Sequence, residues 1–190
     1  MSNPPAPRGA SRERMLETAI DLMRGFGLSG AGINDLVRES GAPKGSVYHF
    51  FPGGKLQIAE EALAAYGPRV RELIVEALAG AEAPPEKVRT LFRAFARRLR
   101  SADFSRSCMV GTVGLDLDDS LEPLRQRLAS TLDGWADAIA AAFDLGSTRR
   151  TRAFAGFVLT AIEGAYVRAR VERSSTPFTE AGEWLATLLE

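Results

Sequence analysis

Apolar residues recur at intervals of three or four along most of the chain, the spacing that places them on one face of an α-helix. Glycine and proline punctuate this pattern and separate one periodic segment from the next. The spacing therefore predicts an all-α fold. The expected helices cover about residues 12–26, 33–40, 43–49, 55–78, 85–99, 120–143, 148–171 and 178–189.

The expected helix over residues 55–78 contains the pair Gly67-Pro68. Proline removes a backbone hydrogen bond and clashes with the preceding helical turn, so we expect a kink or a break at this point. A kink would provide a hinge between the parts of the chain on either side. A proline that only bends the helix around its neighbours fits the sequence equally well.

The segment 107–115 carries no charge and contains several small residues. It is too rich in glycine for a strong helix and too apolar for an exposed loop, so we expect it to be buried with room beside it for a ligand. Its Cys108 has no histidine partner for nucleophilic catalysis nearby in the sequence, because the only histidine is His49. A buried, inert thiol is the favoured interpretation.

The segment 32–51 predicts two short helices joined by a tight turn. Gly41 supplies the left-handed residue that ends the first helix, and Pro43 suits the first turn of the second. Val47 is the only clearly apolar residue within that second helix, which is too short to be stable alone. Neighbouring helices must therefore hold it, with its polar face directed outward.

Two helices joined by a short turn that contains glycine form a helix-turn-helix, and the major groove of DNA admits one such helix. The polar residues that would face the DNA lie on the second helix, and the first helix adds one further candidate. These residues are Lys44, Gly45, Ser46, Tyr48 and His49, with Asn34 as the further candidate.

The run Lys44-Gly45-Ser46-Val47-Tyr48-His49-Phe50-Phe51-Pro52, followed by Lys55, resembles the N-terminal domain of the tetracycline-repressor-like (TetR) family. The resemblance covers about residues 11–63. It implies that Tyr48, His49 and Lys55 contact phosphates, and that the segment 44–46 meets the DNA backbone and base edges. The family usually caps the first motif helix with threonine or serine; this chain has Gly32, so no side-chain phosphate contact is expected there.

The composition is that of a soluble globular protein, with 190 residues, 45% hydrophobic content and no net charge. No apolar run is long enough to span a bilayer, the first ten residues lack signal-peptide features, and a single cysteine fits a reducing compartment, so we expect a cytoplasmic protein. Residues 1–55 hold seven basic and five acidic residues, against 17 and 19 in the remainder. A mildly positive N-terminal part suits a protein that touches DNA with one end, and so few cations imply that two copies bind together.

Features of catalysis and of cofactor or metal binding are scarce. The sequence has no Gly-rich phosphate loop and no paired nucleophile and base, so we predict neither an enzyme nor a cofactor. Asp116, Asp118 and Asp119 fit the capped, acidic start of a helix better than a metal site, because no second ligand cluster accompanies them. The arginines within 89–100 fit a solvated face better than a second nucleic-acid site.

We predict three regions along the chain: a disordered arm over 1–10, a helix-turn-helix DNA-binding domain over 11–55, and a helical effector-binding and dimerisation domain over 56–190. The Pro-rich arm is interpreted as an untethered terminus. Its alternative role is to place Arg8 or Arg12 in an adjacent minor groove.

Aromatic content and position suggest residues for an effector pocket in the body. These candidates are Phe92, Phe95, Met109, Thr112, Trp135, Phe154 and Phe157, and each also suits the hydrophobic core. The Ser-Cys-Met-Val-Gly-Thr-Val run at 107–113 is similar to a segment of drug- and flavonoid-responsive members of the TetR family.

Small and apolar residues also mark the last two expected helices, which pair into a four-helix dimer interface in the TetR family. The interface candidates are Phe154, Val158, Ala161, Ala165, Trp184, Leu185 and Leu188. The alternative is that these helices complete the core of the monomer.

We therefore predict a ligand-responsive transcriptional regulator, and we favour a repressor. It would bind a palindromic double-stranded DNA operator as a homodimer and be released by a small apolar or aromatic effector. The connecting helix over 55–78 would carry the change from the effector to the DNA. The alternatives are a helical adaptor that uses the N-terminal motif for protein contacts, and a cofactor-binding helical enzyme.

Overall fold

The computed structural model describes residues 8–190, with side chains from Ser11 onward. Every regular element in this part of the chain is helical, which confirms the predicted fold class. The elements are α1 (Arg8–Gly30), α2 (Ile33–Ser40), α3 (Lys44–Phe50), α4 (Gly54–Ala79), α5 (Pro84–Arg100), α6 (Met109–Gly114), a 3₁₀ turn (Asp119–Leu121), α7 (Glu122–Ala140), α8 (Thr148–Glu172) and α9 (Thr176–Thr187).

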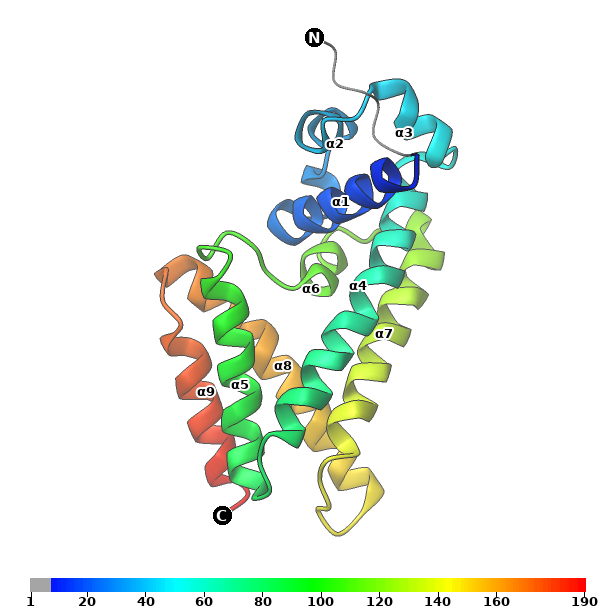
Figure 1. The fold of residues 1–190 in the computed structure, drawn as a ribbon. Coiled ribbons are helices and arrows are strands. Elements are labelled where there is room, and N and C mark those ends of the chain that lie inside the picture. The colour runs from blue at the N-terminus through cyan, green and yellow to red at the C-terminus, as the bar shows by residue number, and fades with distance from the viewer. Residues whose placement is uncertain (1–7) are drawn as a thin grey trace.

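The helices α1, α2 and α3 form a small head at one end of the molecule, and α4 leads from this head into the body (Figure 1). Met15 and Met23 of α1 are buried together with Leu36 of α2 and Val47 of α3. Helix α1 also packs along α4. The head is therefore built on apolar contacts from all of its helices, as a short α3 requires.

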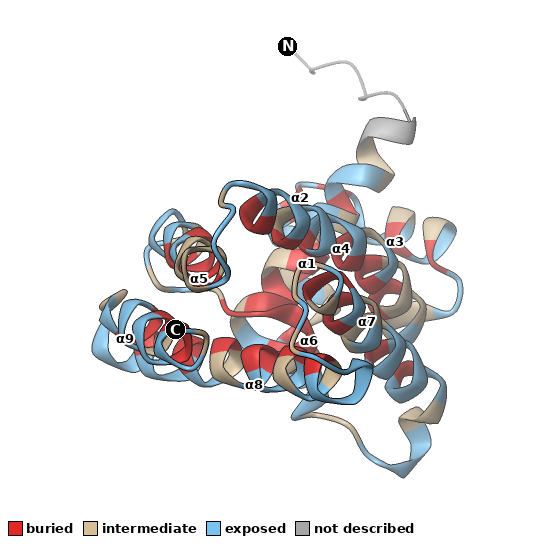
Figure 2. Cartoon of the chain, turned by 90° about the horizontal axis from the view of Figure 1, so that it is seen from below, coloured by how far each residue is buried: buried red, intermediate tan, exposed pale blue. Residues whose placement is uncertain are grey.

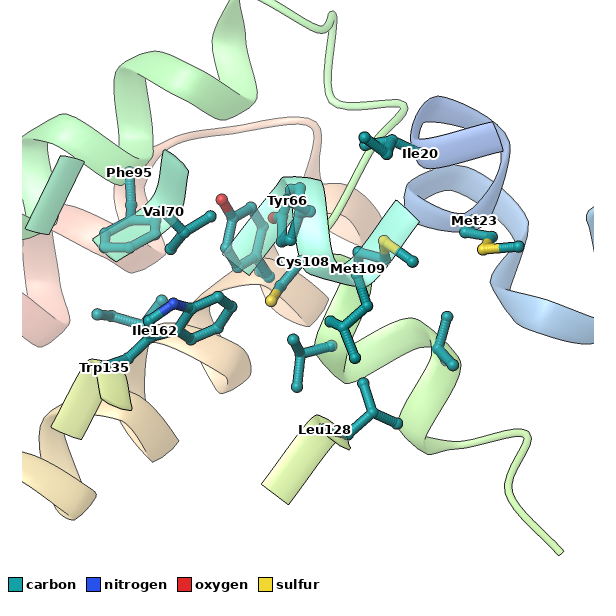
Figure 3. Close-up of a cluster of buried hydrophobic side chains, with 14 of the residues drawn as sticks. Ile20, Met23, Tyr66, Val70, Phe95, Cys108, Met109, Leu128, Trp135 and Ile162 are labelled. Atoms are coloured by element: carbon teal, nitrogen blue, oxygen red, sulfur yellow. The ribbon is translucent and has the colours of Figure 1, made fainter. Parts of the chain in front are cut away.

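The body consists of α4 to α9. Helix α4 lies against α5 and α7, α5 lies against α9, and α8 lies against α7 and α9. The buried faces of these helices turn toward a common interior, and their outer faces are exposed (Figure 2). Tyr66, Trp135 and Cys108 lie in this interior (Figure 3). The hydrophobic core is thus continuous between the head and the body.

Helix α4 runs through Pro68 as a single helix, so the break considered at Gly67-Pro68 does not occur. Packing against α7 accounts for this. A Cβ atom on Gly67 would lie 3.1 Å from Cγ2 of Thr131, and the indole N–H of Trp135 donates a 2.9 Å hydrogen bond to the Gly67 carbonyl. The close approach of α7 therefore supports α4 where proline has removed one of its own hydrogen bonds.

Helix α1 begins at Arg8, so residues 8–10 of the predicted arm belong to a helix, and residues 1–7 lie outside the described residues. Residues 8–14 contain no proline, so nothing prevents the helix from extending back from its first buried residue, Met15, to Arg8. At its other end α1 is interrupted at Gly27, whose φ of 71° and ψ of −170° are not helical. Gly27 lies just beyond residue 26, where the expected helix ends, and it redirects the chain toward α2.

The small-residue segment 107–115 contains a short helix, α6, where the sequence predicted no strong helix. Met109 and Val113 are fully buried, and α6 packs closely on α1. Tertiary contacts therefore stabilise a helix that intrinsic propensity does not favour. Asp118 caps the 3₁₀ turn that precedes α7, in agreement with the predicted acidic helix start.

Candidate functional site

The short helix α3 is held in place by two fully buried side chains, Val47 within it and Phe51 just beyond it. The guanidinium of Arg12 lies 5.2 Å from the centroid of the Phe51 ring and forms an ion pair with Glu61 of α4. These contacts join α3 to α1 and α4. Helix α3 is therefore presented as a fixed ridge on the head. They also attach the half-buried Arg12 to the head, on α1, rather than to a free arm.

The outer face of α3 carries the polar residues that the sequence predicted to face DNA. Lys44, Gly45, Tyr48 and His49 are exposed, and Ser46 is half-buried. Tyr48 keeps 52% of its surface accessible. A Cβ atom on Gly45 would meet nothing within 4 Å, so another backbone can approach closely there. The structure thus gathers five predicted residues on one exposed surface.

Two further DNA-binding candidates lie beside α3. Asn34 is exposed on the first turn of α2. Lys55 is half-buried at the start of α4, and its ammonium donates a 3.1 Å hydrogen bond to the Ser29 carbonyl. Two of the three ammonium hydrogens remain for a phosphate. The N-cap of α2 is Gly32 and provides no side-chain hydrogen bond, as the sequence predicted.

The seven predicted effector-pocket residues do not line a common cavity. Phe92, Phe95, Met109 and Trp135 are buried in the core. Phe154 is half-buried with its ring edge-on to Phe143, and Phe157 is 54% exposed on the outer face of α8. Thr112 is the one candidate that lines a hollow on the body.

This hollow has a volume of about 760 Å³ and lies between α6 and α8. It combines apolar residues with a few polar groups, which is common in small-molecule sites. Its lining residues are Ser107, Gly111, Thr112, Leu115, Thr160, Glu163, Gly164, Val167, Arg170 and Val171. We call it the α6–α8 hollow. The small residues of 107–115 could be recognised in the sequence, whereas Glu163 and Arg170 lie on the distant helix α8 and gave no such signal.

Glu163 and Cys108 are the titratable groups with altered pKa values at this hollow. Burial raises the pKa of the Glu163 carboxyl group, and the neighbouring Cys108 thiol lowers it by less. Burial, followed by the nearby Glu163, raises the pKa of the Cys108 thiol well above its usual value. The thiol is therefore protonated and enclosed at neutral pH, which confirms a buried cysteine and opposes thiolate chemistry.

Three residues that line the α6–α8 hollow also bind the main chain of α1. The Thr112 hydroxyl donates to the Met23 carbonyl at 2.7 Å, the Ser107 amide donates to the Arg24 carbonyl at 2.8 Å, and Arg170 donates to the Gly25 carbonyl at 3.2 Å. We call these three contacts the α1 anchor. The walls of the hollow are thereby joined directly to the head.

The predicted dimer residues divide into two groups. Val158, Ala165 and Leu185 are buried in the core of this chain, and Phe154 and Ala161 pack partly against that core. Trp184 and Leu188 of α9 are largely exposed. Other apolar side chains exposed on α8 are Phe157, which the sequence suggested for the effector pocket, and Val167 and Val171, which it did not single out.

Across residues 8–190, no helix has both the length and the apolar character needed to cross a membrane. The described residues also contain no group of three or more His, Cys, Asp or Glu side chains suited to holding a metal ion.

Sequence comparison places the chain among known regulators. The family of bacterial regulatory proteins called tetR matches residues 15–62, and the C-terminal domain family of LmrA/YxaF-like transcriptional regulators matches residues 84–184. The uncharacterized HTH-type transcriptional regulator Rv0196 of Mycobacterium tuberculosis (strain H37Rv) is 35% identical over 185 residues, which cover 94% of this chain and 93% of that protein. The chain belongs to the TetR family of transcriptional regulators.

Other TetR-family proteins agree with this assignment. The HTH-type transcriptional regulator LmrA of Bacillus subtilis is 29% identical over 184 residues, covering 96% of this chain and 98% of LmrA. A TetR regulatory protein from Rhodobacter sphaeroides has the same fold, with a TM-score of 0.82, 22% identity, and coverage of 93% of this chain and 97% of that one. The described chain is therefore a DNA-binding transcriptional regulator of the TetR type and not an enzyme.

A solved complex in the same family contains DNA. A cysteine mutant of the TetR family regulator CifR, bound to a 26-bp double-stranded operator, superposes with a TM-score of 0.79 at 23% identity and full coverage of both chains. The likeness extends over the head and the body, so the arrangement of these two parts is that of the family fold.

Proposed function

We propose that this protein is a ligand-responsive repressor. It binds a palindromic operator as a homodimer in the cytoplasm and leaves the operator when a small apolar or aromatic effector binds. The observation that carries this proposal is the exposed polar face of α3, held on a head whose core continues into the body. Such a head transmits the position of the body to the DNA-reading helix.

The DNA contacts follow from the placement of the side chains. The segment 44–46 faces the major groove, and Tyr48, His49 and Lys55 supply phosphate contacts that depend on salt. Asn34 of α2 stands beside this surface as a further contact. The head offers few cations, so one head alone would bind weakly, and two heads on one operator would provide the necessary affinity.

A second copy would cover the exposed apolar residues of α8 and α9. Phe157, Val167 and Val171 follow one another on the outer face of α8, and Trp184 and Leu188 lie exposed on α9. The glycines at 156 and 164, on the same face of α8, would meet nothing with an added Cβ and allow a partner helix to approach. A two-fold axis here sets the two heads on half-sites separated by about 34 Å or a multiple of that distance.

The effector must bind one head arrangement better than the other, since equal affinity shifts no equilibrium. Two routes connect the body with the head: helix α4, and the α1 anchor beside α6. A ligand that moves either one reorients α3 relative to its counterpart in the second protomer. The spacing of the heads then no longer fits the operator.

The test is a gel shift with the DNA upstream of the gene for this protein, against a scrambled duplex of equal length. We expect retention of the upstream DNA at salt concentrations that release the scrambled duplex, and a complex of two protomers per operator by sedimentation velocity. Compounds that are small and aromatic should release the DNA.

The adaptor alternative makes the opposite prediction. It is favoured if neither duplex is retained at low salt, where even nonspecific phosphate contacts should suffice. An operator complex with one protomer would contradict the homodimer. An operator complex that no small molecule releases would contradict the response to an effector.

A further inference from the structure

The α6–α8 hollow is apolar at its rim and polar at its floor. Leu115 and Val171 at the rim are 87% and 81% exposed. The floor contains Thr112 and Glu163, both of which are half-buried. This combination suits a small molecule that is mostly apolar and carries a polar group at one end.

The Glu163 carboxylate lacks a strong partner within the protein. No Lys, Arg or His among the described residues lies within ion-pair distance of it. Arg170 lines the same hollow, but its guanidinium donates to the Gly25 carbonyl in the α1 anchor. The neighbouring Cys108 thiol is a weak donor. A half-buried carboxylate that has only a weak donor beside it carries a cost of partial desolvation, and a ligand with a donor would offset that cost.

The backbone opposite Glu163 is shaped around its side chain. A Cβ atom on Gly111 would collide with Oε2 of Glu163, and the three atoms nearest to that position all belong to the Glu163 carboxyl group. Glycine at 111 therefore leaves the carboxylate free to lie across the floor of the hollow. A larger residue would displace it.

We propose that the α6–α8 hollow is the effector site, and that the effector is an apolar aromatic molecule whose N–H or O–H group donates a hydrogen bond to the Glu163 carboxylate. This proposal rests on the proposed function as a ligand-responsive regulator. It assigns the site and the chemical class of the ligand.

The site is placed to act on the head. Ser107, Thr112 and Arg170 line the hollow and also form the α1 anchor, so a ligand that displaces any of them disturbs a direct bond to α1. The hollow also includes Val167 and Val171 of the exposed apolar face on α8. A second protomer on that face would form a roof over the ligand.

The probe for the test is N-phenyl-1-naphthylamine, an apolar aromatic amine with one N–H donor and a fluorescence that increases in apolar surroundings. We expect it to bind the full-length dimer. Displacement is then measured with 1-naphthol and 1-methoxynaphthalene, which differ in a single O–H donor. We expect 1-naphthol to displace the probe at about one tenth of the concentration, as a hydrogen bond to a charged group implies.

Three variants locate the binding. Glu163→Met removes the acceptor and should abolish the preference for 1-naphthol, whereas Glu163→Gln keeps an acceptor oxygen and should retain part of it. Gly111→Leu fills the floor and should weaken probe binding about tenfold or more. The matched control is Gly134→Leu on α7, where an added Cβ would meet nothing within 4 Å. Gly134 lies outside the hollow, so this variant should bind like the wild type.

The proposal is overturned if the wild-type dimer does not bind the probe, or if Gly111→Leu binds it as the wild type does. Failure of the wild type to bind would indicate that a helix of the second copy fills the hollow, and unchanged binding by Gly111→Leu would place the probe at another site. An unchanged preference for 1-naphthol in Glu163→Met would also overturn it.

Operator retention is measured for the same proteins and reports separately on the proposed function. Loss of DNA binding by the wild type, with the naphthol preference intact, would refute the regulator and leave the site standing. Normal DNA binding by the wild type without a preference for 1-naphthol would leave the regulator standing and refute the proposed site.

Discussion

Gly27 lies in α1 beside Thr112 and Asp116 of the body, and its backbone has a conformation that other residues avoid. Its φ of 71° and ψ of −170° lie in a region occupied almost only by glycine. An added Cβ would also lie 3.0 Å from the Thr112 carbonyl and collide with the Asp116 carboxylate, which accepts a 2.9 Å hydrogen bond from the Ser29 amide. The substitution Gly27→Ala therefore combines backbone strain with the loss of a contact.

The expected loss of stability can be worked out from these parts. The strained conformation costs about 1–3 kcal/mol for a residue with a side chain. Displacing Asp116 removes one exposed hydrogen bond, which is worth about 1 kcal/mol. The smaller entropy of the unfolded chain returns about 0.4–1 kcal/mol. The net loss is roughly 1–3.6 kcal/mol, which lowers the melting temperature by about 2–14 °C for a chain of this size.

Two other glycines separate the cost of backbone strain from the cost of the lost contacts. Gly41 also has a positive φ, of 65°, but an added Cβ meets nothing within 4 Å, so Gly41→Ala should lose only about 1 kcal/mol or less. Gly134 is helical and faces open space, so Gly134→Ala should gain up to about 1 kcal/mol.

The assay is thermal and urea unfolding of the three variants and the wild type at equal protein concentration, because dimer formation makes the midpoint depend on concentration. Equal losses for Gly27→Ala and Gly41→Ala would refute the reasoning, since they would show that the contacts with Thr112 and Asp116 add nothing to the strain.

Three further predictions concern function and chemistry. Lys44→Ala should weaken operator binding and reduce the slope of log K against log salt by about 0.9 per head, whereas Arg149→Ala, an exposed cation far from the head, should leave both unchanged. Val171→Asp should convert the dimer to monomers in sedimentation and weaken operator binding. The control Val75→Asp, on α4 and also exposed, should stay dimeric. If both variants stay dimeric, the interface on α8 is refuted. Burial raises the pKa of the Cys108 thiol, so it stays protonated at pH 8, and iodoacetamide should modify it only after unfolding in urea; rapid reaction with the native protein would contradict this.

The head could be predicted closely because its signals are local. Gly41 ends α2 in the left-handed conformation, as predicted, and α3 begins next to Pro43. Val47 is buried, whereas Tyr48 and His49 are exposed, which follows from helical spacing once one apolar residue must face inward. Such predictions need only the position of the turn residues and the helical spacing of side chains over a few residues.

The body could be predicted only as a set of helices, because its site depends on contacts between distant segments. Helical periodicity shows that Trp135 and Phe157 lie on apolar positions, but only packing decides that Trp135 is enclosed and Phe157 exposed. Pro68 predicted an interruption, yet the approach of α7 maintains α4. A proline acts on its own turn, whereas the neighbouring helix contributes contacts that the local sequence does not specify.

The sequence by itself therefore determined the helical fold, the family and the polar surface of α3, since each depends on residues within a few turns of one another. The tertiary structure decided that Glu163 of α8 lies opposite Gly111 of α6, and that the walls of the same hollow bind α1. These residues are far apart along the chain. Their meeting is set by how whole helices pack, which no local spacing records.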